Sequence, residues 1–355
     1  MSAIKTTCLG AYPKPAYVPI IDWFDSHEGR QNMADTRATL SYQQRLAQAG
    51  SAAEPLFVKA AADVIAEQIQ CGIDIPTDGE VRRENYIHYH CRHLHGIDFE
   101  NLTRVLTRDG ASDMALPTIQ STISARAGHF LSQDFKAAQA CTDRPIKVTV
   151  PGPITIADTT ANNFYADKET LYRDLTHALN YEIRALSEAG CRYIQIDEPL
   201  FARKPREALA FGIDNLQRCF HGIGKHTTAI MHMCCGYPNF LDETDYHKAD
   251  PQAYFSLAQA LDDSSIEQVS IEDAHRHNDL SLLDLFQHTH IIFGSFATAS
   301  SRVESVDEIR QRLRGALEYI DQDRLLAAPD CGLGLLGRGL AMQKLMNMCT
   351  AAKSL

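Results

Sequence analysis

The chain has 355 residues, and its 45% hydrophobic and 22% charged content is ordinary for a globular protein. A net charge of -11 and an isoelectric point near 5.7 argue against a nucleic-acid partner. No apolar run reaches the roughly 18 residues of a membrane span, and the first residues lack a signal-peptide core. The ten cysteines have no regular spacing, so we expect free or metal-bound thiols in a reducing cytoplasm, with no membrane partner.

Short apolar segments alternate with segments of helical periodicity along the chain. Strands are expected to begin near residues 6, 73, 145, 192, 226, 268, 290 and 325. Amphipathic helices are expected at 56–70, 168–189, 251–261 and 306–320, and from about residue 340. This alternation predicts one α/β domain over residues 1–355, a single (β/α)8 TIM barrel.

Two segments do not fit this alternation. Residues 25–50 are polar and mixed, and no element is assigned to them. Residues at about 88–130 are histidine-rich, polar and weakly periodic, so we expect an irregular insertion after strand 2 of the barrel. Because the insertion follows the C-terminal end of a strand, it is expected near the barrel mouth.

The strand that begins near residue 226 ends in ligand-type side chains. Side chains on a strand alternate between its two faces. His232 and Cys234 therefore share one face, and Cys235 points to the other. A His-x-Cys pair at the end of an apolar strand can provide two ligands of a tetrahedral metal site. Cys235 is the alternative ligand, although a buried thiol packed against a helix is the favoured interpretation.

Three further ligand-type residues fall at strand ends, namely Asp197, Glu272 and Cys331. Barrels of this type place their chemistry at the C-terminal ends of their strands. One imidazole, two thiolates and one carboxylate suit Zn²⁺, which is a borderline-soft ion. The predicted zinc ligands are His232, Cys234, Glu272 and Cys331.

A zinc site with two thiolate ligands favours one kind of chemistry. A thiol that binds zinc loses its proton and becomes a nucleophile at neutral pH. Two thiolate ligands also donate charge to the ion and weaken its power to acidify water, which disfavours hydrolysis. The predicted reaction is therefore alkylation of a substrate thiol.

Several motifs together resemble the C-terminal catalytic barrel of cobalamin-independent methionine synthase. The resemblance covers residues from about 5 to 340. The segments that carry it are Leu9 to Ala11, Thr77 to Glu80, Val150 to Thr155, Ile194 to Pro199, His232 to Cys234, Ser270 to Glu272 and Pro329 to Gly334.

The resemblance implies a reaction and a role for each matching residue. In that family a zinc-bound homocysteine thiolate attacks a methyl group and methionine is formed. The four predicted ligands match the family's zinc ligands. Glu80 and Asp197 match carboxylates that hold the amino group of homocysteine. The backbone of Leu9, Gly10 and Ala11 matches the segment that receives its carboxylate, although the family usually has Ser where Ala11 stands.

The chain departs from the family where the methyl donor binds. The family has a Trp that stacks on the folate ring, and here Thr159 stands in its place, while the only Trp is Trp23. The family also has an Asp-x-His pair whose His protonates the folate, and here Ala297 and Ala299 stand there. Methyl-folate is a poor electrophile unless its nitrogen is protonated. No protein general acid is identified, so a methylated corrinoid or a partner protein's product is expected as an alternative donor to methyl-folate, and the sequence leaves all three open.

A second cluster of potential ligands lies in the expected insertion and consists of His88, His90, Cys91, His93 and His95. On a strand His88 and His90 would share a face, as would His93 and His95. One interpretation is a solvated, partly aromatic loop near the site, and the other is a second metal site.

Three other functions remain open from the sequence. A related zinc-dependent alkyltransferase would act on another thiol, such as coenzyme M. A decarboxylase of the same superfamily would act on a porphyrin without metal and would not need the four aligned ligands. A non-enzymatic module would only carry a corrinoid or zinc. Retention of both Glu80 and Asp197 favours an amino-acid thiol as the substrate.

Overall fold

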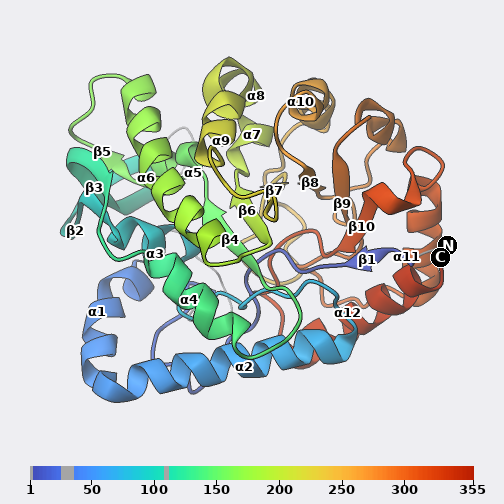
Figure 1. Cartoon of the computed structure of the whole chain (residues 1–355), viewed down its shortest axis with the longest axis horizontal. Coiled ribbons are helices and arrows are strands. Elements are labelled where there is room, and N and C mark those ends of the chain that lie inside the picture. Colours follow the sequence, from blue (N-terminus) through green and yellow to red (C-terminus); the bar gives the residue numbers. More distant parts are fainter. Residues whose placement is uncertain (1–2, 25–35, 108–111) are drawn as a thin grey trace.

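A parallel sheet that curls into a barrel forms the centre of the protein (Figure 1). The computed structural model describes residues 3–24, 36–107 and 112–355. Within these residues a sheet of seven strands has the order β1-β10-β9-β8-β7-β6-β4, and every neighbouring pair is parallel. The strands are β1 (Lys5–Thr6), β4 (Lys147–Pro151), β6 (Tyr193–Asp197), β7 (Thr228–Met233), β8 (Gln268–Ile271), β9 (His290–Gly294) and β10 (Leu325–Ala328).

A short extended segment closes the ring between β1 and β4. Thr7 forms a parallel bridge with Ile75, and Thr77 forms another with Lys147. This segment occupies the place of the second predicted strand, which began near residue 73. The predicted (β/α)8 TIM barrel is confirmed, and its second strand is reduced to two isolated bridges.

Helices surround the sheet on its outer side (Figure 1). Long helices such as α6 carry apolar side chains at helical spacing on the buried face, and the Asp167 side chain caps α6 by accepting from Thr170 N. No helix within the described residues combines the length and apolarity that a membrane span requires. The helices are α1 (Arg37–Ala49), α2 (Ala53–Cys71), α3 (Tyr86–Arg92), α4 (Phe130–Gln139), α5 (Pro153–Asp158), α6 (Lys168–Glu188), α7 (Leu200–Arg203), α8 (Pro205–Glu207), α9 (Ile213–Cys219), α10 (Gln252–Asp262), α11 (Val306–Ala316) and α12 (Arg338–Lys353).

Two separate apolar clusters follow from the alternation of side chains along the strands. The larger cluster fills the space between the strands and the helices. The smaller cluster includes Leu9, Ile230 and Leu326, whose strands lie around the ring, so it lies in the barrel interior. Buried polar side chains on the same strand face, such as Lys147, Gln195 and Ser270, share the interior with this cluster.

The expected insertion after strand 2 is present, but at about 88–130 it is regular rather than irregular. This segment contains part of α3, then the long antiparallel hairpin β2 (Leu94–Thr107) and β3 (Ser112–Ala125), and the start of α4. The short strand β5 (Ala161–Asn162) adds to β3 in parallel. Two register shifts in the hairpin, between His95 and Ile97 and between Asp98 and Thr103, interrupt its alternation. These irregularities explain why the periodicity of the sequence was weak.

Both interpretations of the histidine cluster were wrong for residues 88–93, because His88 and His90 lie on a helix. Residues two apart on a helix do not share a face. His88 is buried and its Nδ1 lies 2.8 Å from Thr39 Oγ1, while His90 Nδ1 lies 2.9 Å from Tyr86 O. The His93 ring stacks on Phe130 at 3.8 Å. These side chains pack the insertion against the barrel and do not converge on a common point.

The N-terminal segment contains a helix that the sequence did not reveal. α1 fills most of the second half of residues 25–50, which carry no predicted element. Residues 25–35 lie outside the described part of the chain. α1 buries only Ala38, Thr39 and Tyr42, so its apolar pattern is too sparse to be recognised.

Candidate functional site

Three of the four predicted metal ligands meet at the barrel mouth. His232 lies on β7, Cys234 directly follows that strand, and Cys331 follows β10. One ligand atom from each lies within 4.8 Å of the other two, and Cys331 Sγ lies 3.5 Å from His232 Nε2. His232 and Cys234 are almost completely buried. This spacing fits a single ion that is bound by one nitrogen and two sulfur atoms.

The neighbouring strand fixes the orientation of the His232 ring. Its Nδ1 lies 3.0 Å from the hydroxyl of Ser270, and the sheet register pairs the two residues. Nε2 therefore faces the two sulfur atoms. A metal-binding histidine is commonly held in this way by a polar partner on its other ring nitrogen.

The two thiols share a proton network with the imidazole. A hydrogen bond from Cys331, together with the neighbouring His232, lowers the pKa of Cys234 well below its usual value. The same contact and burial raise the pKa of Cys331. One thiolate is thus favoured before any ion binds, and a cation would favour the second. The donor set therefore fits zinc.

The predicted ligand Glu272 lies outside this group. Its Oε1 contacts Lys248 Nζ, and its Oε2 accepts from Cys235 N at 3.1 Å. Its carboxylate instead lies within 4.8 Å of polar atoms of His275 and Asp330. Burial, followed by the charge of Asp330, raises the pKa of Glu272. Lys248 and the Cys235 N–H therefore engage both carboxylate oxygens of Glu272 in this arrangement.

Cys235, the alternative ligand, belongs to the outer apolar cluster. Burial and the nearby Glu272 raise the pKa of its thiol to about 11. The Cys235 side chain lies on the opposite side of the strand from the group formed by His232, Cys234 and Cys331. This is the arrangement that strand alternation predicts.

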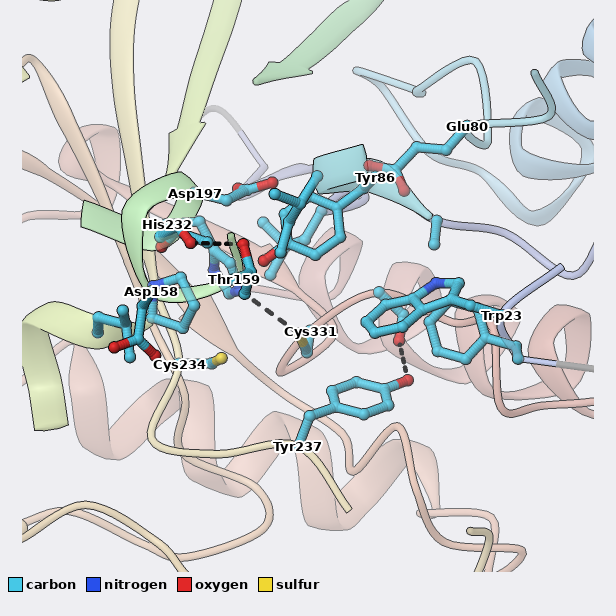
Figure 2. A pocket seen from close by; sticks show the side chains of 18 of the residues that line it. Trp23, Glu80, Tyr86, Asp158, Thr159, Asp197, His232, Cys234, Tyr237 and Cys331 are labelled. Carbon is cyan, nitrogen blue, oxygen red and sulfur yellow. Dashed lines mark hydrogen bonds between the residues drawn. The ribbon is translucent and has the colours of Figure 1, made fainter. Parts of the chain in front are cut away.

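One cavity joins the ligand cluster to the predicted substrate residues (Figure 2). His232, Cys234 and Cys331 line it. The predicted homocysteine-binding residues that also line it are Leu9, Ala11, Glu80 and Asp197. Residues from distant parts of the sequence therefore form one site.

Glu80 is held in place by its local backbone and by β4. Its φ of 55° is unusual for a residue with a side chain, and its N–H donates to Asp78 Oδ1 at 2.9 Å. Thr149 Oγ1 donates to Glu80 Oε1 at 2.7 Å, and Arg83 lies 3.4 Å away. A Cβ atom on Gly10 would lie 2.7 Å from the same oxygen, so glycine is required there. Burial raises the pKa of Glu80.

Asp197 lies at the end of β6, directly beside His232 in the register. Gln195 Nε2 donates to Asp197 Oδ1 at 2.7 Å. Burial raises the pKa of Asp197 to about 7, while the neighbouring His232 opposes the shift. A buried carboxyl with a near-neutral pKa gains a charge readily when a cation arrives.

The next residue, Glu198, has a different task. Its carboxylate accepts from Ile154 N at 2.9 Å and from Thr155 N and Thr155 Oγ1 at 3.1 and 2.8 Å. It therefore holds the first turn of α5 against the end of β6. A Cβ atom on Gly152 would collide with this side chain at 2.1 Å.

Four aromatic residues that the sequence did not assign to the site also line the cavity. We refer to them as the aromatic wall, which consists of Trp23, Phe24, Tyr86 and Tyr237. Ring centroids of Trp23 lie 4.8 Å from Phe24 and 5.8 Å from Tyr86, and Phe24 lies 5.8 Å from Tyr237. A useful signal was available for Tyr237, because it follows the ligand strand β7 by only a few residues.

The positions of the family's folate-binding residues differ in their relation to the cavity. Thr159 lines it, as the matching position in the family would suggest. Ala297 and Ala299 are buried, and neither lines it. The Ala299 N–H donates to His275 Nε2 at 3.2 Å, and Asp330 holds the other ring nitrogen of His275 at 2.7 Å. His275 is therefore engaged on both sides.

These features define a (β/α)8 barrel protein with a thiolate and imidazole centre at its mouth. A family model for the catalytic domain of the cobalamin-independent synthase matches residues 29–354, so the chain belongs to that family. A methionine synthase from Thermococcus kodakarensis is 31% identical over 347 residues, covering 97% of this chain and 91% of the relative. One from Saccharolobus solfataricus is 29% identical over 354 residues, covering 99% and 94%.

Solved structures agree with this assignment. The B12-independent methionine synthase from Shewanella sp. W3-18-1, in complex with selenomethionine, superposes with a TM-score of 0.84 at 27% identity. The alignment covers 99% of this chain and 98% of that one. A methyltransferase from Methanosarcina mazei, at 13% identity and a TM-score of 0.59, covers 100% and 94% and supports the fold alone.

Proposed function

We propose that the chain is a zinc-dependent methyltransferase that moves a methyl group onto the thiol of homocysteine to form methionine. It would act as one catalytic domain, in a cytoplasm that keeps its ten free cysteines reduced. One observation carries the proposal, which is that the three-residue ligand cluster shares a cavity with two buried carboxylates. Family membership supports a methyltransferase, and the names of the relatives point to methionine as the product.

His232, Cys234 and Cys331 are the proposed zinc ligands. Zinc bound there would lower the pKa of the substrate thiol, so that the thiol binds as a thiolate at neutral pH. Ser270 keeps the imidazole oriented for this task. Glu272 remains the proposed fourth ligand, and it can take that place only if its carboxylate leaves Lys248.

Glu80 and Asp197 are the proposed partners of the homocysteine ammonium group. Both are buried, and burial raises the pKa of each, so an ammonium between them would offset the cost of their charge. Thr149 and Gln195 hold the two carboxylates in place through hydrogen bonds. The backbone of residues 9–11 is proposed to receive the carboxylate group of homocysteine, since Leu9 and Ala11 line the same cavity.

The donor is proposed to be something other than methyl-folate. A folate nitrogen must be protonated before it leaves, and Ala297 and Ala299 offer no acid. A methylated corrinoid or the product of a partner protein avoids this requirement. The alternative function is transfer to another thiol, and the pair of carboxylates favours an amino-acid thiol over coenzyme M.

The decisive experiment measures methionine formation from homocysteine by the purified protein, with and without zinc. Methylcobalamin and methyl-folate are compared side by side as donors. We expect zinc to be required and methyl-folate to be inactive. Turnover of methyl-folate at ordinary enzymatic rates by the zinc protein alone would refute the donor assignment. Failure of the zinc protein to bind homocysteine or methionine would refute the acceptor assignment.

A further inference from the structure

The aromatic wall lines the cavity, but none of its four residues is among those proposed to bind zinc or homocysteine. Its rings contact one another through edges and tilted faces, and Tyr86 also packs against the apolar core. Tyr237 Oη donates to Gly332 O at 2.9 Å, which ties the wall to the residue after Cys331. Phe24 packs so closely on Gly334 that a Cβ atom there would lie 2.3 Å from its ring. The wall is therefore fixed relative to the metal ligands.

The wall faces the reacting end of the cavity. Figure 2 shows Trp23 and Tyr237 across from His232 and Asp158, with Cys331 between the two groups. A molecule that rests on the wall would thus lie next to the position proposed for the substrate sulfur. Homocysteine itself is accounted for by the carboxylates and by the backbone of residues 9–11.

The cavity lining offers an onium group aromatic faces and one carboxyl group, Asp158, beyond the two that are proposed to bind the homocysteine ammonium group. Glu80, Asp158 and Asp197 contribute carboxyl groups, and Arg203 is the single Lys or Arg among the described lining residues. Lys204 contacts Asp158 but does not line the cavity. Aromatic faces attract onium groups through the ring quadrupole, and Trp does so most strongly.

The carboxyl groups of Glu80 and Asp197 line the cavity, but a bound homocysteine ammonium would keep both ionised and unavailable as acids. His232 is the single histidine among the described lining residues, and it is a proposed ligand. The phenols of Tyr86 and Tyr237 are weak acids, because burial raises the pKa of each well above its usual value. A methyl donor whose leaving group needs a proton is poorly served here.

We propose that the aromatic wall is a subsite for a cationic methyl carrier, a trialkylsulfonium or quaternary ammonium compound, whose methyl group it holds beside the homocysteine sulfur. This inference rests on the proposed function and names its donor class. The lone pair of the homocysteine thiolate forms the new carbon–sulfur bond. The bond from methyl to the onium atom breaks, its electron pair stays on that atom, and a neutral sulfide or amine departs. No proton, oxidant or reductant is needed, because the thiol has already lost its proton on binding.

Trp23 provides a direct measurement, since it is the only tryptophan in the chain and lines the cavity. Its fluorescence in the zinc-loaded protein is followed while trimethylsulfonium, tetramethylammonium or choline is added. The neutral tert-butyl analogue of choline has the same shape without the charge. We expect the cations to change the fluorescence saturably and to bind about tenfold or more tightly than the neutral analogue.

Variants separate the wall from the rest of the site, with binding followed by calorimetry. Trp23→Leu is expected to weaken cation binding about tenfold, and Trp23→Phe less. Tyr181→Leu removes a half-exposed ring on α6, outside the cavity, and is expected to change nothing. Isotope-labelled trimethylsulfonium should transfer its label to methionine in the presence of homocysteine.

Two outcomes would overturn the subsite. One is equal binding of choline and its neutral analogue, or no binding of any cation, in a protein that still binds methionine. The other is methionine formation from methylcobalamin but from no onium compound. Both leave the proposed function intact. Loss of methionine and homocysteine binding in the wild-type zinc protein would instead remove the proposed function and the subsite together.

Discussion

The two sides of the cavity are built from different kinds of structure. The acceptor side consists of strand ends, and its side chains are fixed by neighbours in the sheet, as Ser270 fixes His232 and Gln195 fixes Asp197. The donor side consists of the aromatic wall, which comes from the segment before residue 25, from α3 and from the loop after β7. The contrast suggests that thiol activation is held constant by the sheet, while the loops are free to change the methyl donor.

The largest effect is expected when a proposed zinc ligand on the acceptor side is replaced. Cys331→Ser should lower zinc affinity by roughly a thousandfold, because one of the two thiolates is lost. The measurement is competition with a chelator of known affinity. Cys235→Ser serves as the matched control, since Cys235 lies in the outer cluster, and it should retain full zinc binding. Equal losses in both variants would mean that the ligands are wrongly assigned.

The next largest effect is expected when one of the two protein carboxylates proposed to bind the homocysteine ammonium group is removed. Glu80→Gln keeps the size of the side chain and its contact with Thr149, but loses the charge that faces the ammonium group. We expect homocysteine affinity to fall about a hundredfold, with zinc content unchanged. Calorimetry on the zinc-loaded proteins measures both. An unchanged affinity would show that the ammonium group binds elsewhere.

A smaller effect tests how far the sheet fixes the ligands. Ser270→Ala removes the partner of His232 Nδ1, and zinc affinity should fall about tenfold. Onium binding to the aromatic wall should stay within about twofold, because the wall makes no contact with β8. If both affinities fell together, the two sides would not be independent.

The smallest effect concerns the support beneath the acceptor side. Burial raises the pKa of Glu198 to about 8, which is above the value of an unfolded glutamate, so the folded state holds a proton that the unfolded state releases. The free energy of unfolding should therefore fall as the pH rises between these two values, by at most about 1.4 kcal/mol per pH unit. Glu198→Gln should lose this slope in urea denaturation. An identical slope in both proteins would mean that Glu198 is ionised when buried.

The candidate residues of the proposed acceptor side could be selected from the sequence because the information is local. Strand alternation separates His232 and Cys234 from Cys235, and each ligand stands directly after an apolar run. The barrel follows from the same runs, and its confirmation includes the closing segment near residue 75.

The parts that escaped prediction depend on contacts between distant residues. Trp23 and Tyr86 belong to segments without a periodic pattern, so nothing in the sequence indicates that they meet across a cavity. The contact of Lys248 with Glu272 is equally invisible, although it decides whether that carboxylate is free to bind a metal. In the hairpin, register shifts interrupt the alternation of apolar and polar residues, so the two long strands could not be recognised from the sequence.

The pairing of β1 with β10 has a consequence for the order in which the protein folds. Lys5 lies opposite Leu326, so the ring closes between segments that are far apart in the sequence. Contacts of such long separation form slowly and late in folding. Cys331 follows the end of β10 by three residues and lies 99 positions beyond His232 in the sequence. The proposed ligand set is therefore incomplete until Cys331 has been made, and closure of the barrel brings its members together.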